Sequence, residues 1–239
     1  MSHFFRKIRP TLNSKPKKYI AYAIGEILII IIGIMIAVGI NNWNELRKQE
    51  NTLNNIYAII AEDLNNNIDH INEILIRKEE KKPTFTKVLN GLMTREDYEK
   101  CPECAYIIMG YSDLSIETRG YNLLNSFSNS SELTDDSLSL SIIQFYSEQL
   151  TELHADDLAK HNINISNFDE WENNYDWYSD FVTDRDNKGF IEYALTDHDY
   201  ISRVATYYLY LYRVDIPSYE EFNEKATTLI NLIEKRLNK

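Results

Sequence analysis

The chain has 239 residues and a formal net charge of −12, and its apolar residues are concentrated in one stretch near the N-terminus. The part that follows this stretch is long enough to bury a core without disulfides or metals. Its acidic surface repels nucleic acids and anionic lipid headgroups, so neither is an expected partner.

Residues 20–43 are predicted to form a transmembrane helix. From Ile20 to Ile40 the chain has 21 residues with one ionisable side chain. At about 1.5 Å per residue, such a helix spans the roughly 30 Å hydrocarbon core of a bilayer. Cleavable signal sequences have apolar segments of only about 7 to 15 residues, so the longer stretch favours a retained signal anchor. The lipid bilayer is therefore a predicted partner.

The charges on either side of this helix predict its orientation. Residues 1–19 contain six basic residues and no acidic residue, whereas the 20 residues after Ile40 contain only Arg47 and Lys48 as basic residues. The positive-inside rule therefore places the 1–19 tail in the cytoplasm. The exported part, from residue 44 onward, then carries a formal charge of −17.

A long juxtamembrane helix is predicted to follow without a break over residues 44–82. No glycine or proline occurs between Asn41 and Lys82, and apolar residues recur at helical spacing. Pro83 is predicted to end this helix. The apolar seam fits either a coiled coil between chains or packing into the chain's own bundle; it consists of Leu53, Ile56, Ile60, Leu64, Ile68, Ile71 and Leu75.

Residues 83–239 are predicted to form a helical domain. With 7 glycines, 5 prolines and no clear alternating strand pattern, the sequence predicts an all-α bundle. The segment "HNINISN" at 161–167 is a candidate interruption, and 207–212 favours a buried helix face over a strand because it lies inside a longer capped segment. Helices are expected over 84–93, 115–127, from Thr134 to about Leu153, over 168–181, from Thr196 to about Arg213, and from a capping box at Ser218 to about Leu237.

Several short segments resemble a known family. They are "FFRKIR" at 4–9, "YAIGEI" at 22–27, "IGIMIA" at 32–37 and "NNWNE" at 41–45, followed less closely by "RGYNLLNS" at 119–126 and "IIQFYSEQL" at 142–150. The pattern resembles a family of bacterial membrane proteins catalogued as domain of unknown function 6090. The resemblance implies a single-pass protein of a Gram-negative bacterium with an exported helical domain, and it implies no activity.

Glu26 is the one ionisable residue of the predicted membrane helix. It lies roughly 9 Å into the hydrocarbon core, where a charged group is costly. At about 100° per residue, Gly33 and Ala37 fall about 20° to either side of it. Because such a pair of small residues lets another helix approach closely, a role in helix association is favoured. The alternatives are a side chain that snorkels to the cytoplasmic interface and a group that transfers protons.

Cys101 and Cys104 lie three residues apart on the predicted oxidising side of the membrane, which favours a local disulfide. Free thiols, a metal site and a redox centre are the alternatives. A tetrahedral zinc site needs four ligands, and no second cysteine pair occurs. A thioredoxin-like motif requires a βαβ unit, which the sequence does not predict.

His154, Asp157 and His161 fall on one helix face and are weak candidates for a metal site. Such residues on an outward face are more often solvated. The segment 184–195 begins like a calcium loop, but Lys188 and Leu195 occupy positions that require ligands. It is better interpreted as a polar turn, and no cofactor is predicted.

The sequence contains no glycine-flanked serine elbow, no phosphate-binding glycine loop and no H-E-x-x-H motif. It therefore predicts a non-enzymatic protein. Together with the predicted orientation, the family resemblance implies a protein of the bacterial inner membrane with a periplasmic helical domain. This protein would contact other membrane or periplasmic proteins, or copies of itself, through its transmembrane and juxtamembrane helices. The alternative is an ion-coupled or ligand-sensing module that uses Glu26 or an aromatic pocket, although the 29 aromatic residues could equally fill the core.

Overall fold

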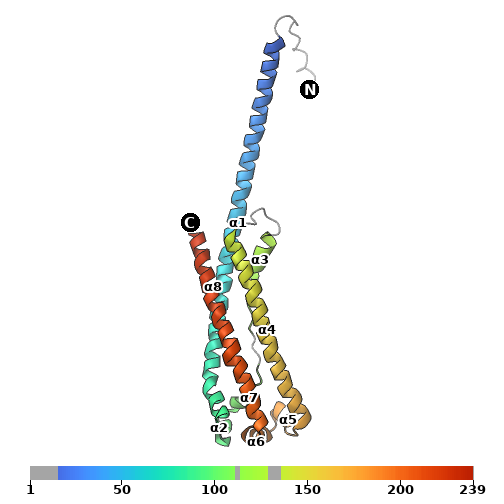
Figure 1. Cartoon of the computed structure of the whole chain (residues 1–239), viewed down its shortest axis with the longest axis vertical. Helices are drawn as coiled ribbons and strands as arrows, with labels where there is room; N and C mark the ends of the chain where they lie inside the picture. Colours follow the sequence, from blue (N-terminus) through green and yellow to red (C-terminus); the bar gives the residue numbers. More distant parts are fainter. Residues whose placement is uncertain (1–15, 111–113, 129–135, 239) are drawn as a thin grey trace. The chain divides into compact units, whose positions relative to one another are not determined.

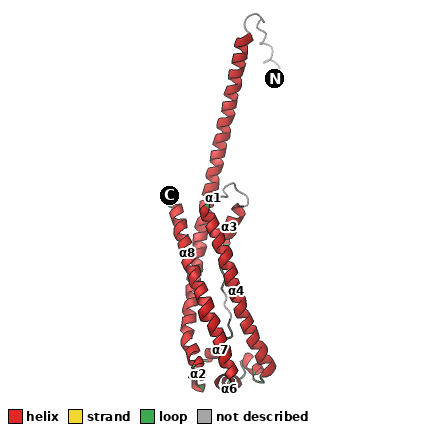
Figure 2. Cartoon of the chain, viewed as in Figure 1, coloured by secondary structure: helices red, strands yellow, loops and turns green. Residues whose placement is uncertain are grey.

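The computed structural model describes residues 16–110, 114–128 and 136–238, and within these ranges the chain forms helices joined by turns and short irregular segments, with no strand (Figures 1 and 2). The predicted all-α class is confirmed. The chain divides into two units, Met1–Thr52 and Leu53–Lys239. The helices are α1 (Pro16–Leu89), α2 (Arg95–Lys100), α3 (Arg119–Ser128), α4 (Ser137–Asn174), α5 (Tyr178–Val182), α6 (Lys188–Thr196), α7 (His198–Tyr210) and α8 (Ile216–Leu237), with a 3₁₀ segment η2 (Pro102–Tyr106) and a π-helical segment η3 (Leu211–Asp215).

In the first unit, the described chain is the N-terminal part of α1. This helix is long and apolar enough to cross a membrane, and none of its most apolar window is buried. Its isoleucines point in every direction around the axis, which is typical of a helix that needs an apolar environment on all sides. The predicted basic tail lies for the most part outside the described residues.

The helix α1 continues without a break to Leu89, as predicted for the membrane and juxtamembrane segments, but the predicted end at Pro83 is wrong. Proline removes one N–H from the helix ladder. The following turn is held in place nevertheless, because Phe85 and Val88 are fully or almost fully buried. The helix ends before Gly91, whose φ of 65° allows the N–H groups of Gly91 and Leu92 to bond back to Val88 and Lys87. The helix predicted over 84–93 is thus mostly the last part of α1.

Within the second unit, α1, α3, α4 and α8 surround a first hydrophobic core (Figure 1). Most of the predicted apolar seam of α1 is buried there, and Ile68 and Leu75 pack partly buried against it. The seam therefore packs into the chain's own bundle, and the coiled-coil alternative fails because this surface is already covered. The core is built on Leu53, Ile56, Tyr57, Ile60, Leu64, Ile71, Ile74, Leu124, Ile142, Phe145, Tyr146, Leu153, Tyr219, Phe222, Ala226, Leu229, Ile230 and Ile233.

The helix α3 is attached to α1 by a buried carboxylate. Asp63, which is fully buried, accepts a hydrogen bond of 2.6 Å from the backbone N–H of Gly120 and pairs with Arg119 at 3.1 Å. A Cβ atom at Gly120 would lie 2.6 Å from Cγ1 of Ile60, so only glycine allows this close approach. The side chain of Asn67 bonds both backbone groups of Glu117. These contacts start α3 at Arg119, later than the predicted start at Ser115.

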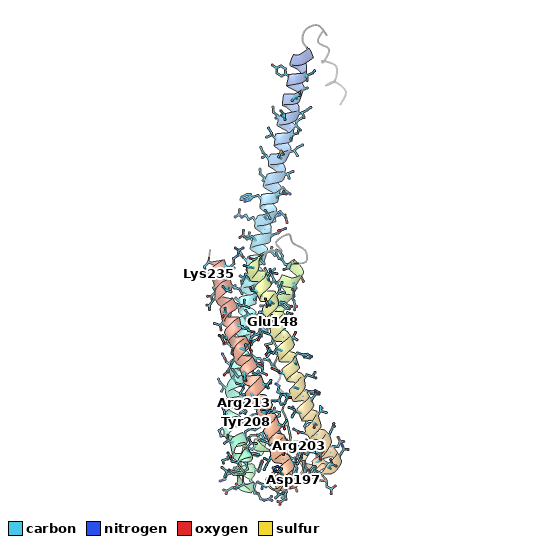
Figure 3. The ribbon with its side chains drawn as sticks, viewed as in Figure 1. Glu148, Asp197, Arg203, Tyr208, Arg213 and Lys235 are labelled. Carbon is cyan, nitrogen blue, oxygen red and sulfur yellow. A yellow bond between two sulfur atoms is a disulfide. The ribbon has the colours of Figure 1, made fainter. Side chains whose placement is uncertain are left out.

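A second core, rich in aromatic residues, is formed by the ends of α1 and α4 together with α2, α5, α6 and α7. The rings of Phe181 and Phe190 stack at 4.3 Å. Trp171 donates its indole N–H to the hydroxyl of Tyr193 at 3.0 Å, and Tyr193 donates to Asp199 at 2.7 Å. Figure 3 shows Arg203 and Asp197 at this end of the bundle. The second core is filled by side chains that pack against one another: Phe85, Tyr98, Trp171, Phe181, Phe190, Tyr193, Tyr200 and Tyr207.

The helix α4 begins later and runs further than predicted. Asp136 is its N-cap and accepts from the N–H of Ser139, whereas the predicted start, Thr134, lies outside the described residues. The helix continues through 161–167 to Asn174, so the expected interruption does not occur. Asn164 and Asn167 are buried in this segment, and tertiary packing there outweighs the low helix propensity of asparagine. The aromatic segment 168–181 is divided between α4 and α5.

The helices α7 and α8 are joined through η3 rather than by a loop. The predicted helix over 207–212 is confirmed, but the capping box at Ser218 is wrong. Ser218 lies inside α8, where its hydroxyl donates to Asp156 at 2.7 Å. In η3 the N–H of Ile216 bonds to the carbonyl of Leu211, five residues earlier. This π-helical turn places Asp215 in the interior, where it is 1% exposed, and such turns are frequent at functional sites.

Candidate functional site

Glu26, Gly33 and Ala37 lie on the exposed surface of α1 in the first unit. A Cβ atom added at Gly33 would meet no atom within 4 Å. Because α1 is continuous here, the helical spacing keeps the three residues on one stripe. The described residues of this unit leave that stripe open.

Cys101 and Cys104 are joined by a disulfide, with their Cα atoms 5.4 Å apart. The bond spans the start of η2, and Cys104 is buried at the edge of the second core. A cross-link between residues so close in the chain removes little loop entropy and fixes the local turn after α2.

His154, Asp157 and His161 do not form a metal site. The described residues contain no group of three or more histidine, cysteine, aspartate or glutamate side chains placed to hold a metal ion. His154 and His161 are exposed on α4, and Asp157 lies 3.7 Å from the ammonium group of Lys160.

The most unusual polar group in the fold consists of residues that the sequence analysis did not select. Asp215 accepts hydrogen bonds on one oxygen, Oδ2, from two lysines: Lys78 at 2.6 Å and Lys160 at 2.8 Å. The side chains of Asp215, Lys160 and Lys78 are 1%, 2% and 11% exposed. They come from η3, α4 and α1 and are called here the lysine–aspartate cluster. Two buried ammonium groups thus share a single buried carboxylate.

The pKa values of the two lysines of the cluster shift in opposite directions. The pKa of Lys78 is lowered to about 8, because burial and the nearby charge of Lys160 together outweigh the opposing pull of Asp215. Burial also acts to lower the pKa of Lys160, but the charge and hydrogen bond of Asp215 together with those of Tyr219 outweigh it, so the net shift is upward. Both ammonium groups lie near the ring of Tyr219, at 4.7 and 5.8 Å from its centre. Lys160 and Asp215 therefore act as the firm ion pair, and Lys78 is the additional cation.

A half-enclosed cavity of about 240 Å³ lies beside the lysine–aspartate cluster. Its floor includes Lys78 and Lys160, and the exposed side chains of Arg77 and Lys81 lie at its rim. The described residues that line it include no acidic side chain. The full lining is His70, Ile74, Arg77, Lys78, Lys81, Ile107, Gly110, Lys160, Tyr207 and Leu211. This arrangement can hold an anion.

Comparison with known proteins gives one match. A family of unknown function (DUF6090) matches residues 26–155, which is more than half of the chain. No curated protein and no solved structure matches the chain. The matched range contains Glu26, the disulfide and Lys78, but it ends before Lys160 and Asp215. On this evidence the chain belongs to the DUF6090 family of unknown function.

Proposed function

We propose that the chain is a membrane-anchored, non-enzymatic protein that acts through contacts with other proteins. The observation that carries this proposal is the apolar part of α1, in which no residue of the most apolar window is buried. A helix of this kind satisfies its own backbone hydrogen bonds and suits a bilayer. No enzyme motif and no assembled catalytic group among the described residues argues for a reaction.

The proposed location is a bacterial inner membrane, with residues 1–19 in the cytoplasm and the helical bundle in the periplasm. The excess of six basic residues in the tail supports this orientation. The Cys101–Cys104 disulfide agrees with it, because disulfides persist in oxidising compartments.

Within the membrane, we propose that another helix packs on the stripe of Glu26, Gly33 and Ala37. Open space around Gly33 would let a partner backbone approach closely. The partner is a second copy of this chain or another membrane protein. The juxtamembrane seam from Leu53 onward plays no part in this association, because the bundle covers it.

Cross-linking of the full chain in native membranes tests this association. Wild type is expected to give a cross-linked species that Gly33→Leu and Ala37→Leu reduce, because leucine would hold the partner helix away. Gly39→Leu is the matched control, since Gly39 lies about 140° around the helix from Glu26. A strictly monomeric protein, or equal effects of all three substitutions, would show that the stripe is not a contact.

Ion coupling through Glu26 is the second candidate function, favoured by the exposure of this acid on an apolar helix. Glu26→Gln keeps the shape and hydrogen bonding of the side chain but cannot release a proton. If Glu26→Gln abolishes function while cross-linking is preserved, ion coupling is supported. If Glu26→Gln and Glu26→Leu both leave partner recovery and phenotype intact, Glu26 has no such role.

A further inference from the structure

The cavity beside the lysine–aspartate cluster has an unusual charge for this protein. The whole chain carries −12, yet two lysines and an arginine from α1 and one lysine from α4 line this space. Arg77 pairs with Glu73 at a distance of 3.9 Å, and both side chains are exposed, so this pair neutralises Arg77 weakly. Like charges gathered in one place repel one another, so their concentration here favours an anion from outside the chain.

The single carboxylate of Asp215 does not neutralise both ammonium groups on the floor of the cavity. Lys78 and Lys160 share one oxygen of Asp215, and the only other acid paired with either lysine in the described residues is Asp157, at 3.7 Å from Lys160. An ammonium group has three donors, and within the described chain Lys78 makes one hydrogen bond from its side chain, to Asp215. Because Lys78 lines the cavity, its remaining donors can bond to an acceptor that enters it, and an anionic acceptor gives the stronger, charge-assisted hydrogen bond.

The other side of the cavity is apolar. Ile74, Ile107 and Leu211 line it, and each is less than a tenth exposed. Ligand sites typically combine such an apolar wall with a few placed polar groups that orient the ligand. At about 240 Å³, the space suits a molecule no larger than a small ring with one charged substituent.

We infer that this cavity binds a small organic anion, with its carboxylate or phosphate head on Lys78 and Lys160 and its apolar part against Ile74, Ile107 and Leu211. Arg77 and Lys81 at the rim attract the anion and contact it less closely. The negative charge of the ligand neutralises the second ammonium group, which the single carboxylate of Asp215 does not. This inference does not depend on the proposed association in the membrane, because every residue involved belongs to the second unit.

Binding to the full chain in a non-ionic detergent tests the inference, by thermal unfolding and by calorimetry. A ligand that binds only the folded state raises the unfolding temperature. Benzoate and phenyl phosphate carry the two candidate head groups on the same ring, and the tighter of the two identifies the preferred head. Benzamide, the neutral counterpart of benzoate, is expected not to bind, and acetate is expected to bind more weakly because it lacks the ring.

Substitutions then locate the site. Lys160→Met is expected to weaken binding about tenfold or more, because it removes a charged hydrogen-bond donor. Arg77→Gln and Lys81→Gln alter only exposed side chains, so they are expected to weaken binding several-fold without changing the unfolding temperature of the free protein. Lys235→Gln is the matched control, since Lys235 lies near the C-terminal end of α8 (Figure 3).

The inference is overturned if neither aromatic anion binds or if benzamide binds as well as benzoate. Acetate binding as tightly as benzoate would overturn the apolar contact. Equal affinity in the rim variants, in Lys160→Met and in Lys235→Gln would show that the anion binds elsewhere.

Discussion

Asp63 illustrates how a single residue determines the placement of a helix. Its carboxylate is fully buried, accepts from the N–H of Gly120 and pairs with Arg119. A carboxylate at a helix N-terminus satisfies an otherwise unpaired N–H group and interacts favourably with the helix dipole. Arg119 and Gly120 of the motif "RGY" at 119–121 are therefore explained by their contacts with Asp63 of α1.

Asp63→Asn is expected to destabilise the folded chain by about 1–3 kcal/mol, because it replaces the charged acceptor in a buried hydrogen bond. Chemical denaturation of the full chain in detergent would measure the loss. Glu62→Gln is the matched control, because Glu62 pairs with the same Arg119 at 2.8 Å but is 63% exposed, and exposed pairs contribute little. A smaller effect for Asp63→Asn than for Glu62→Gln would contradict the capping role.

At the residue scale, only contacts between near neighbours could be predicted from the sequence. Helical spacing alone placed Gly33 and Ala37 beside Glu26, and a separation of three residues suggested the Cys101–Cys104 pair. Lys78 and Asp215 are 137 residues apart, and no local pattern connects them. One signal was present: Lys78 follows Ile71 and Ile74 at helical spacing, so a lysine occupies an inward position of the seam.

At the scale of elements, α1 carries a proline within a helix that continues for two further turns. Pro83 cannot donate a hydrogen bond to the preceding turn. The contacts of Phe85 and Val88 with the second core hold these turns in place despite that loss.

Pro83→Ala is expected to stabilise the chain by about 1–2 kcal/mol, because alanine restores the N–H and favours the helix, although proline restricts the unfolded chain. The midpoint of denaturation would show it. Pro102→Ala is the control, since Pro102 lies at the start of η2, where the N–H that alanine restores would have no helical acceptor. A loss of stability in Pro83→Ala would instead mean that the restriction proline places on the unfolded chain outweighs the restored hydrogen bond.

The helices themselves could be predicted, but several of their ends could not. Apolar spacing identified α1, α4, α7 and α8, because one face of each contacts a core. Local signals at Pro83, Ser115 and Ser218 gave wrong helix ends. Contacts with distant parts of the chain determine where these helices start or continue, and they are made by Phe85, Asp63 and Asp156.

At the scale of the whole molecule, stability is expected to rise with pH between about 8 and 10. The pKa of Lys78 is lowered from 10.5 to about 8 in the folded chain, so in this window the unfolded chain binds more protons. The pKa of Lys160 is raised, so its contribution to the stability of the folded chain is lost only at higher pH. Lys78 is surrounded by Asp215, Lys160, Lys81 and the ring of Tyr219.

Denaturation curves across this pH range would test the prediction. The rise is expected in wild type and absent in Lys78→Met, which removes the additional cation and leaves the pair of Lys160 and Asp215. Lys82→Met should retain the rise, because the Lys82 side chain is 45% exposed. An unchanged slope in Lys78→Met would assign the pH dependence to another group.

Because the tryptophans are unequally distributed, tryptophan fluorescence can distinguish the second core from the first. Trp171 and Trp177 belong to the second core, whereas the described residues of the first core include tyrosines and no tryptophan. Trp43 lies apart on α1 and is 64% exposed. With Trp43 replaced by phenylalanine, indole emission would follow the opening of the second core alone, so any independent unfolding of the two cores becomes visible as a mismatch between fluorescence and helical circular dichroism.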